Sequence, residues 1–364
     1  MDYELYKEYI IQTVSYYPKY IQENILRNLK EQKIVIDNPD LPSNETIPNV
    51  SGLTDLEKIC KSLYEKQEAI KYIEEWEFFR PYKYAILFQY DGLKTDALKL
   101  LLESEAVIPF TKGHDSFDSL QELLIDGITP SVLNRPTVLE TDAVVYYKFN
   151  IRFKGFLPGT GKQTKLKYPM VILVYKDIPV VEIRLDRINS YYKENETFYR
   201  DKIRLVTSWL RDVLGVTLDN INLQPIIDYI EKNKDEEVVV SAKRMNLRTG
   251  GKATLESNEE FILPLLGELK EFIKLHDDQF EQSPVIKQLL QDFIADIEET
   301  SDFPWISLRW KHLIKTKQIT VKFQHNYYDE GYTLLQYIGI QKELERMDYV
   351  TRYLIRSKED SERE

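Results

Sequence analysis

The chain has 364 residues and a net charge of −11, and its 43% hydrophobic and 30% charged content is typical of a globular protein with a sizeable core. Its single cysteine excludes an intramolecular disulfide and a zinc site built from several cysteines. The longest apolar runs are only strand-length and the first residues are charged, so we expect no membrane-spanning segment, no signal peptide and a cytoplasmic location.

The N-terminal part of the chain is predicted to be mainly helical. Apolar and aromatic residues recur at helical spacing over residues 3–33, with a break at Pro18, which cannot continue a helix. A proline-rich linker follows over residues 37–52, and Thr54 or Ser51 can cap the helix after it. The elements expected next are, in chain order, a long helix ending at Phe79, a buried strand at 84–90, and helices at 95–103 and 116–125.

The rest of the chain alternates blocks of strands with pairs of helices. In chain order, the predicted elements are strands at 143–153, 165–175 and 180–185, helices at 196–214 and 219–232, a hairpin at 237–245 and 253–256, helices at 258–276 and 283–300, strands at 305–313, 318–325 and 332–337, and a helix at 341–355. These blocks predict an α+β fold, in which antiparallel sheets carry helical layers and follow an N-terminal helical region. The expected domains are an N-terminal helical segment at 1–36, the linker at 37–52, a helical and mixed domain at 53–140, an α+β domain at 141–356 and a charged tail at 357–364.

Positive charge is concentrated in three stretches that contain no Asp or Glu. These stretches cover residues 143–176, 238–255 and 303–328, and they hold sixteen of the 49 Lys and Arg residues. Such segregation in an acidic chain favours a basic surface that faces a polyanion or an acidic partner. The alternative is that strands and their connecting tips are poor in acidic residues for conformational reasons alone.

Two segments of these stretches have the composition of a phosphate-binding surface. Residues 243–252 place four cationic side chains beside amide and hydroxyl groups, and residues 308–317 interleave cations with Trp310, an aromatic that can stack on an unpaired base. The residues that we predict to contact nucleic acid are Lys162, Lys165, Lys167, Lys243, Arg244, Arg248, Lys252, Arg309, Lys311, Lys315 and Lys317. We therefore predict a non-enzymatic, nucleic-acid-binding component of a larger bacterial or phage system, which contacts phosphates through basic hairpin tips.

The motifs for catalysis and for cofactor binding fail on spacing. Residues 155–164 resemble a phosphate-binding loop, but Phe156 stands where its first glycine belongs and Gln163 where its Ser or Thr belongs. The four histidines are scattered, and no serine lies in a nucleophile-elbow context. The sequence therefore predicts no catalytic residue, no metal site and no cofactor.

Two alternatives to nucleic-acid binding remain open at this point. The first is an adaptor or structural subunit that binds a protein partner, or a second copy of itself, through the tyrosine-rich helix within residues 1–36, because Tyr suits interfaces. The second is a divergent metal-dependent nuclease centred on Glu182, with Asp177 as a second carboxylate and Arg184 in the place of the usual lysine. The alternation of Glu182, Arg184 and Asp186 is equally typical of a solvated sheet face.

Overall fold

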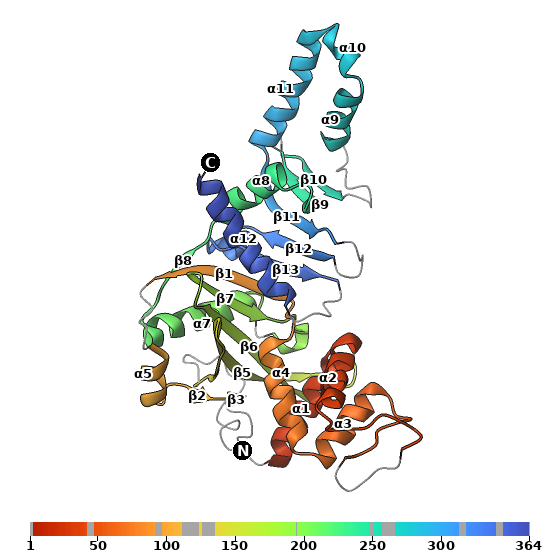
Figure 1. The fold of residues 1–364 in the computed structure, drawn as a ribbon, viewed down its shortest axis with the longest axis vertical. Helices are drawn as coiled ribbons and strands as arrows, with labels where there is room; N and C mark the ends of the chain where they lie inside the picture. Colours follow the sequence, from red (N-terminus) through yellow and green to blue (C-terminus); the bar gives the residue numbers. More distant parts are fainter. Residues whose placement is uncertain are drawn as a thin grey trace. The chain divides into compact units, whose positions relative to one another are not determined.

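The structure is a computed structural model that describes residues 3–41, 47–91, 97–110, 124–125, 135–193, 195–247, 250–256, 266–312, 318–339 and 345–363. The chain divides into two compact units, unit 1 (residues 1–219 and 342–345) and unit 2 (residues 220–341 and 346–364). Each unit combines helices with a mainly antiparallel set of strands, so the predicted α+β fold is confirmed (Figure 1).

Unit 1 begins with four helices that share one apolar core. They are α1 (Tyr3–Tyr16), α2 (Lys19–Glu31), α3 (Asp55–Glu65) and α4 (Glu68–Phe79). Pro18 separates α1 from α2, as predicted. Two of the tyrosines that made α1 a candidate interface, Tyr6 and Tyr9, are buried in this core.

The long helix that was predicted to end at Phe79 is two helices instead of one. Thr54 caps α3 with a capping box, in which its side chain accepts from Glu57 and the Glu57 carboxylate accepts from the Thr54 backbone. The helix then stops because Lys66 has an extended backbone, and α4 starts two residues later. The helical periodicity continues across the break, which explains why the sequence pattern did not reveal it.

The sheet of unit 1 contains the three central strands that the sequence predicted. Its strands are β1 (Tyr84–Asp91), β2 (Ile108–Pro109), β3 (Leu124–Ile125), β4 (Thr137–Glu140), β5 (Val144–Phe156), β6 (Gln163–Tyr175) and β7 (Val180–Leu185). The order is β1-β7-β6-β5-β4-β2; the pairs are antiparallel except β2 with β4, and β3 lies parallel to β5. The remaining elements are α5 (Ala97–Glu103), a 3-10 turn η1 (Ser190–Tyr192), α7 (Phe198–Leu214) and β8 (Thr217–Asn220).

Most of the helix predicted at residues 116–125 lies outside the described residues. Its last two residues, Leu124 and Ile125, form strand β3, so the prediction is wrong there. The short pairing with β5 is a long-range contact, and such contacts override local helical periodicity.

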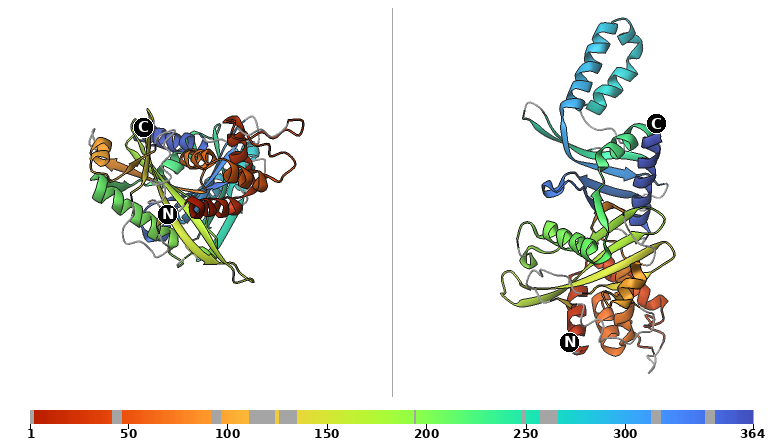
Figure 2. Two further views of the ribbon diagram at one scale, coloured as in Figure 1. Left: turned by 90° about the horizontal axis from the view of Figure 1, so that it is seen from below. Right: turned by 90° about the vertical axis from the view of Figure 1, so that its left-hand side faces the viewer.

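Unit 2 is built on a five-stranded antiparallel sheet in the order β10-β9-β11-β12-β13. Its strands are β9 (Val238–Asn246), β10 (Lys252–Glu256), β11 (Asp302–Trp310), β12 (Ile319–Gln324) and β13 (Leu334–Ile338). Its helices are α8 (Leu223–Asn233), α9 (Leu266–Leu275), α10 (Asp277–Glu281), α11 (Pro284–Thr300) and α12 (Arg346–Arg363), with a 3-10 turn η3 (Tyr327–Asp329). The helices α9 to α11 form a hairpin that extends from this sheet between β10 and β11 (Figure 2).

The final helix is longer than predicted. We expected it to end at Ile355 before a charged tail, but α12 continues through that tail to Arg363. Opposite charges four residues apart support the last turns, in the pairs Lys358–Glu362 and Glu359–Arg363. Among the helices that the structure describes, none is both long and apolar enough to cross a bilayer.

Candidate nucleic-acid interface

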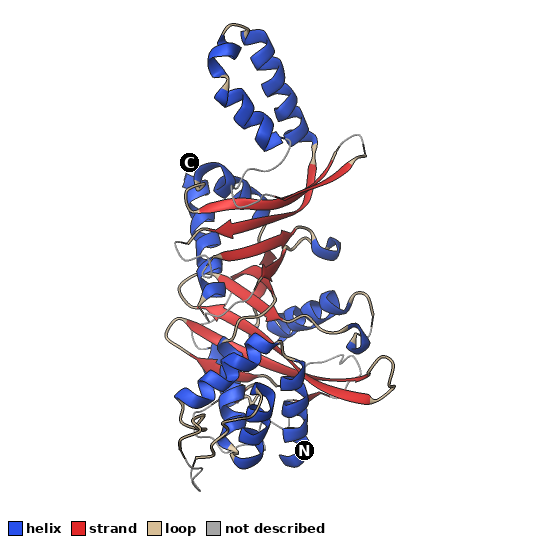
Figure 3. Ribbon diagram, turned by 90° about the vertical axis from the view of Figure 1, so that its right-hand side faces the viewer, coloured by secondary structure: helices blue, strands red, loops and turns tan. Residues whose placement is uncertain are grey.

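The two faces of the unit 2 sheet differ in what covers them. Side chains of one face, which we call the covered face, are buried; they include Val240, Ile306, Leu308, Val321, Phe323 and Leu335. Trp310 belongs to this face, and its ring lies 5.9 Å from that of Tyr353 on α12 (centroid to centroid), so α12 packs here (Figure 3). The side chains that alternate with these form the open face. Ser307 and Leu334 on this face are buried. Its exposed or partly exposed members include Arg244, Lys252, Thr254, Glu256, Trp305, Arg309, Thr320, Lys322, Gln324 and Gln336.

A β-bulge on β9 decides which cation reaches the open face. Leu308 of β11 pairs with Val240, but its neighbour Ser307 pairs with Ala242, so Ser241 is an extra residue on β9. Ser241 is buried and its hydroxyl donates to the carbonyl oxygen of Ser307 at 3.1 Å. Because the bulge shifts the alternation by one residue, Arg244 lies on the open face and Lys243 on the covered face.

Cross-strand register brings Arg244 and Lys322 together around Trp305. Trp305 pairs directly with Arg244 on β9 and with Gln324 on β12. Lys322 lies two pairs further along, opposite Ser307, and therefore on the same face. The Lys322 Nζ is 3.8 Å from the centroid of the Trp305 ring, which is the geometry of a cation–π contact. An aromatic ring, a guanidinium and an ammonium therefore form one cluster on the open face.

The electrostatics of this cluster favour an incoming anion. Burial, and then the positive charge of Arg244, lower the pKa of Lys322, which means that the two cations repel each other in the free protein. In the part of the chain that the structure describes, neither Arg244 nor Lys322 has a carboxylate within ion-pair distance. Two acidic side chains lie at the margin of this face: Glu256 ends β10 opposite Ala242, and Asp302 accepts a hydrogen bond from the Asn246 amide at 3.2 Å.

Three of the predicted contact residues thus share the open face, namely Arg244, Lys252 and Arg309. Lys252 begins β10 opposite Asn246 and is exposed, and Arg309 lies opposite Thr320. Arg248, Lys315 and Lys317 were also predicted, and they lie outside the described residues.

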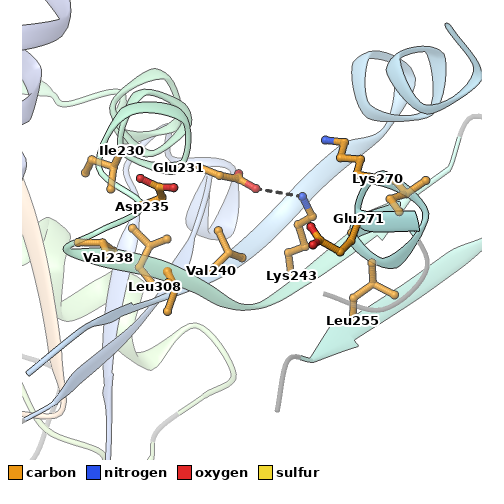
Figure 4. A pocket seen from close by; sticks show the side chains of 13 residues that line it. Ile230, Glu231, Asp235, Val238, Val240, Lys243, Leu255, Lys270, Glu271 and Leu308 are labelled. Carbon is orange, nitrogen blue, oxygen red and sulfur yellow. Dashed lines mark hydrogen bonds and ion pairs between the residues drawn. The ribbon is translucent and has the colours of Figure 1, made fainter. Parts of the chain in front are cut away.

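Two other predicted residues of unit 2 point elsewhere. Lys243 lines a 280 Å³ pocket under α8 and α9, and its Nζ is 3.4 Å from a carboxylate oxygen of Glu231 (Figure 4). The Lys311 ammonium donates to the carbonyl oxygen of Asp235 at 2.6 Å, although its side chain is exposed. Neither lysine belongs to the open face, because Lys243 pairs with Glu231 and Lys311 donates to Asp235 away from it.

The predicted residues of unit 1 do not form a surface of this kind. Lys162 is exposed in the turn between β5 and β6, and the Lys165 Nζ lies 5.4 Å from the centroid of the Tyr9 ring. Lys167 is only 1% exposed and binds the carboxylates of Glu74 and Glu77 on α4. A phosphate cannot reach Lys167 in this structure.

Lys167 belongs to a buried charge cluster of two lysines and two glutamates. Lys148 completes it, with its Nζ 2.6 Å from Glu74 and 3.2 Å from Glu77, and Tyr6 donates to Glu74 from α1. Burial alone would raise the pKa of Glu74, but the charges of Lys148 and Lys167 outweigh it and hold that pKa well below its usual range. The cluster therefore joins α1 and α4 to β5 and β6, and its charges are internally balanced.

Of the two carboxylates behind the nuclease alternative, Glu182 is buried and paired, whereas Asp177 is exposed in the turn between β6 and β7. Glu182 accepts from the Arg184 Nε at 2.7 Å and from the Tyr175 hydroxyl at 2.8 Å, so the expectation of a solvated face there is wrong. No group of three or more potential metal ligands is present among the described residues. The nuclease alternative gains no support from this geometry.

Trp305 and Lys322 were missed as site residues, whereas Trp310 was expected to stack on a base and is buried. The strand pattern could have shown this difference. Residues 305 and 310 are five positions apart, so their side chains must point to opposite sides of β11. Comparison with known proteins adds nothing to this assignment: no protein-family model and no curated protein matches the chain.

Proposed function

We propose that the protein binds single-stranded nucleic acid on the open face of unit 2, without catalysing a reaction there. The observation that supports this proposal is the cluster of Arg244, Lys322 and Trp305, in which two cations lie together without a carboxylate among the described residues. Two like charges held close together are unfavourable unless an anion joins them. A phosphate between Arg244 and Lys322 relieves this repulsion.

Each side chain of the cluster has a separate task in this proposal. The Arg244 guanidinium can bind a phosphate with two parallel hydrogen bonds, and Lys322 contributes a mobile point charge. A base that stacks on Trp305 displaces the Lys322 ammonium from the ring onto the adjacent phosphate. Gln324, Gln336 and Thr320 offer amide and hydroxyl groups to the neighbouring nucleotides.

The chemistry of the open face favours a single strand over a duplex. Stacking on a side chain requires unpaired bases, which a duplex does not offer. The acidic remainder of the chain repels phosphates and so restricts binding to this face.

The test is fluorescence-anisotropy binding of labelled single-stranded DNA and RNA, and of the matching duplexes, across a salt series. The variants are Arg244→Ala and Lys322→Ala, with Lys274→Ala, an exposed cation of α9, as the matched control. Each of the two interface variants should weaken binding about tenfold, because a hydrogen bond to a charged group contributes about 1.5–3 kcal/mol. Each should also lower the slope of log K against log salt by about 0.7, the value for one phosphate of a single strand.

Two results would overturn the proposal. One is the absence of binding by the wild-type chain at low salt. The other is equal weakening by Lys274→Ala and Arg244→Ala, which would mean that binding depends on total charge and not on the open face.

A further inference from the structure

The helical hairpin of unit 2 has a large apolar face that the other described residues leave uncovered. The side chains of Phe272 and Leu275 on α9 and of Val285, Ile286, Leu289 and Phe293 on α11 are between 50 and 71% exposed. A contiguous apolar surface of this kind on a protein marks an interaction site. We call these six side chains the hairpin face.

Helical periodicity places all six side chains on the same side of the hairpin. The core between the two helices is marked by Ile273 and Ile294, which are buried. At 100° per residue, the exposed apolar residues of α9 and those of α11 turn away from this core toward the same side. The opposite side is polar, and Lys270, Lys274, Lys287 and Gln291 line a depression there.

We propose that the hairpin face binds the hairpin face of a second copy of this chain, which makes an antiparallel four-helix bundle. Val285, Leu289 and Phe293 are spaced four residues apart, so the row is symmetric about Leu289. In an antiparallel pair of α11 helices, Leu289 lies against Leu289 of the second copy, and the small Val285 lies against the large Phe293. Such self-complementarity is what a two-fold interface requires.

The charges of α11 favour this antiparallel arrangement. Asp292 and Asp296 lie in its second half, whereas Lys287 in its first half pairs with Asp277 on the opposite side of the hairpin. Antiparallel pairing brings the acidic half of each helix beside the positive N-terminal end of the other. Because α9 runs antiparallel to α11 within each hairpin, every neighbouring pair in the bundle is antiparallel.

The exposed area is sufficient for a stable dimer. The six side chains expose roughly 700 Å² of apolar surface per copy, if a fully exposed side chain of this size has about 200 Å². A standard interface buries about 800 Å² on each partner, and the polar margins of the two helices supply the difference.

The first test is the mass of the full chain by sedimentation equilibrium across a wide concentration range. The wild type is expected at twice 43.2 kDa, and Leu289→Asp should raise the dimer dissociation constant by roughly 30-fold or more, as at an interface hot spot. Gln291→Asp puts the same charge on the opposite side of α11 and should leave the dimer intact. A monomeric wild type would overturn the proposal, and the partner of the hairpin face would then be a different protein or a lipid surface.

The second test does not depend on how a charged variant folds. In a Cys60→Ala background, Leu289→Cys should form a covalent dimer with a short bifunctional thiol reagent, because residue 289 meets itself on the two-fold axis. Gln291→Cys should not form one. Equal cross-linking of both variants, or none for Leu289→Cys, would show that any dimer forms through another surface.

Discussion

Both units contain stretches without Asp or Glu, but such a stretch supplies buried, paired cations in unit 1 and cations on an open surface in unit 2. In unit 1, Lys148 and Lys167 are buried against Glu74 and Glu77 of a helix that lies 71 to 93 residues earlier in the chain. In unit 2, Arg244 and Lys322 lie on an open sheet face beside Trp305, and no carboxylate of the described residues pairs with them. The local composition is therefore the same for a structural cation and for a binding cation, and only the distant partner distinguishes them.

The largest expected effect is on the buried charge cluster. Glu74→Gln removes one carboxylate and leaves two buried lysines with only Glu77, so we expect the free energy of unfolding of unit 1 to fall by about 3–5 kcal/mol. Urea denaturation, with hydrogen exchange to locate the loss, measures it. The control is Glu65→Gln, which breaks an exposed pair with Lys61 and should cost at most about 1 kcal/mol. If both variants lose the same amount, the cluster does not stabilise unit 1 as described.

The second expected effect is that the stabilities of the two units fall in different pH ranges. Burial, opposed in part by Asp302, lowers the pKa of His325 to about 4 from an ordinary value of 6.5. The unfolded chain therefore takes up the proton first, and the stability of unit 2 should fall by up to about 3 kcal/mol as the pH drops from 6.5 to 4.

The carboxylate of Glu74 gives unit 1 a different pH range. The pKa of Glu74 is lowered, so its contribution is complete above the ordinary value of 4.5 and is lost only as the pH falls below it. Hydrogen exchange at pH 5 should show unit 2 weakened and unit 1 unchanged. In His325→Gln the loss in unit 2 should disappear, and its persistence would contradict this assignment.

The third effect concerns Trp305. Of the four tryptophans, Trp76, Trp209 and Trp310 are buried, so a stacked base should quench mainly Trp305 fluorescence. Trp305→Ala should cost about 1–3 kcal/mol of binding and remove most of the quenching. Trp305→Phe keeps a ring and should retain most of the affinity. Unchanged affinity in Trp305→Ala would restrict the role of the open face to phosphate contacts.

The smallest expected effect tests whether a change in the stability of unit 1 also changes nucleic-acid affinity. Thr54→Ala removes the capping box of α3 and should lower the stability of unit 1 by about 1 kcal/mol, with no change in nucleic-acid affinity. Denaturation and anisotropy on the same sample measure both quantities. A loss of affinity in this variant would mean that the stability of unit 1 limits binding, and the other variants would then need correction for it.

The sequence predicted most helices and strands, but it did not predict which side chains of a strand are buried and which are exposed. The strand patterns predicted β5, β6 and β7 in unit 1 and β11, β12 and β13 in unit 2. Pro18 marked the break between α1 and α2, and Thr54 marked a helix cap. The burial of Lys167 could not be predicted in this way, because it depends on carboxylates from α4. Likewise, simple alternation from Val238 assigns Lys243 to the open face and Arg244 to the covered one, and the bulge reverses both.

The bulge at Ser241 also means that the chemistry of this surface depends on a count of residues as much as on their identity. If Ser241 instead entered the regular pairing of β9 with β11, without any change of sequence, β9 would turn Arg244 toward the helices and Lys243 and Met245 toward solvent. Deletion of Ser241 should remove the bulge and leave Arg244 opposite Trp305, whereas insertion of one residue between Ser241 and Lys243 should move Lys243 to the open face and Arg244 to the covered face. An insertion after Ser241 should therefore alter binding more than the deletion of Ser241 itself.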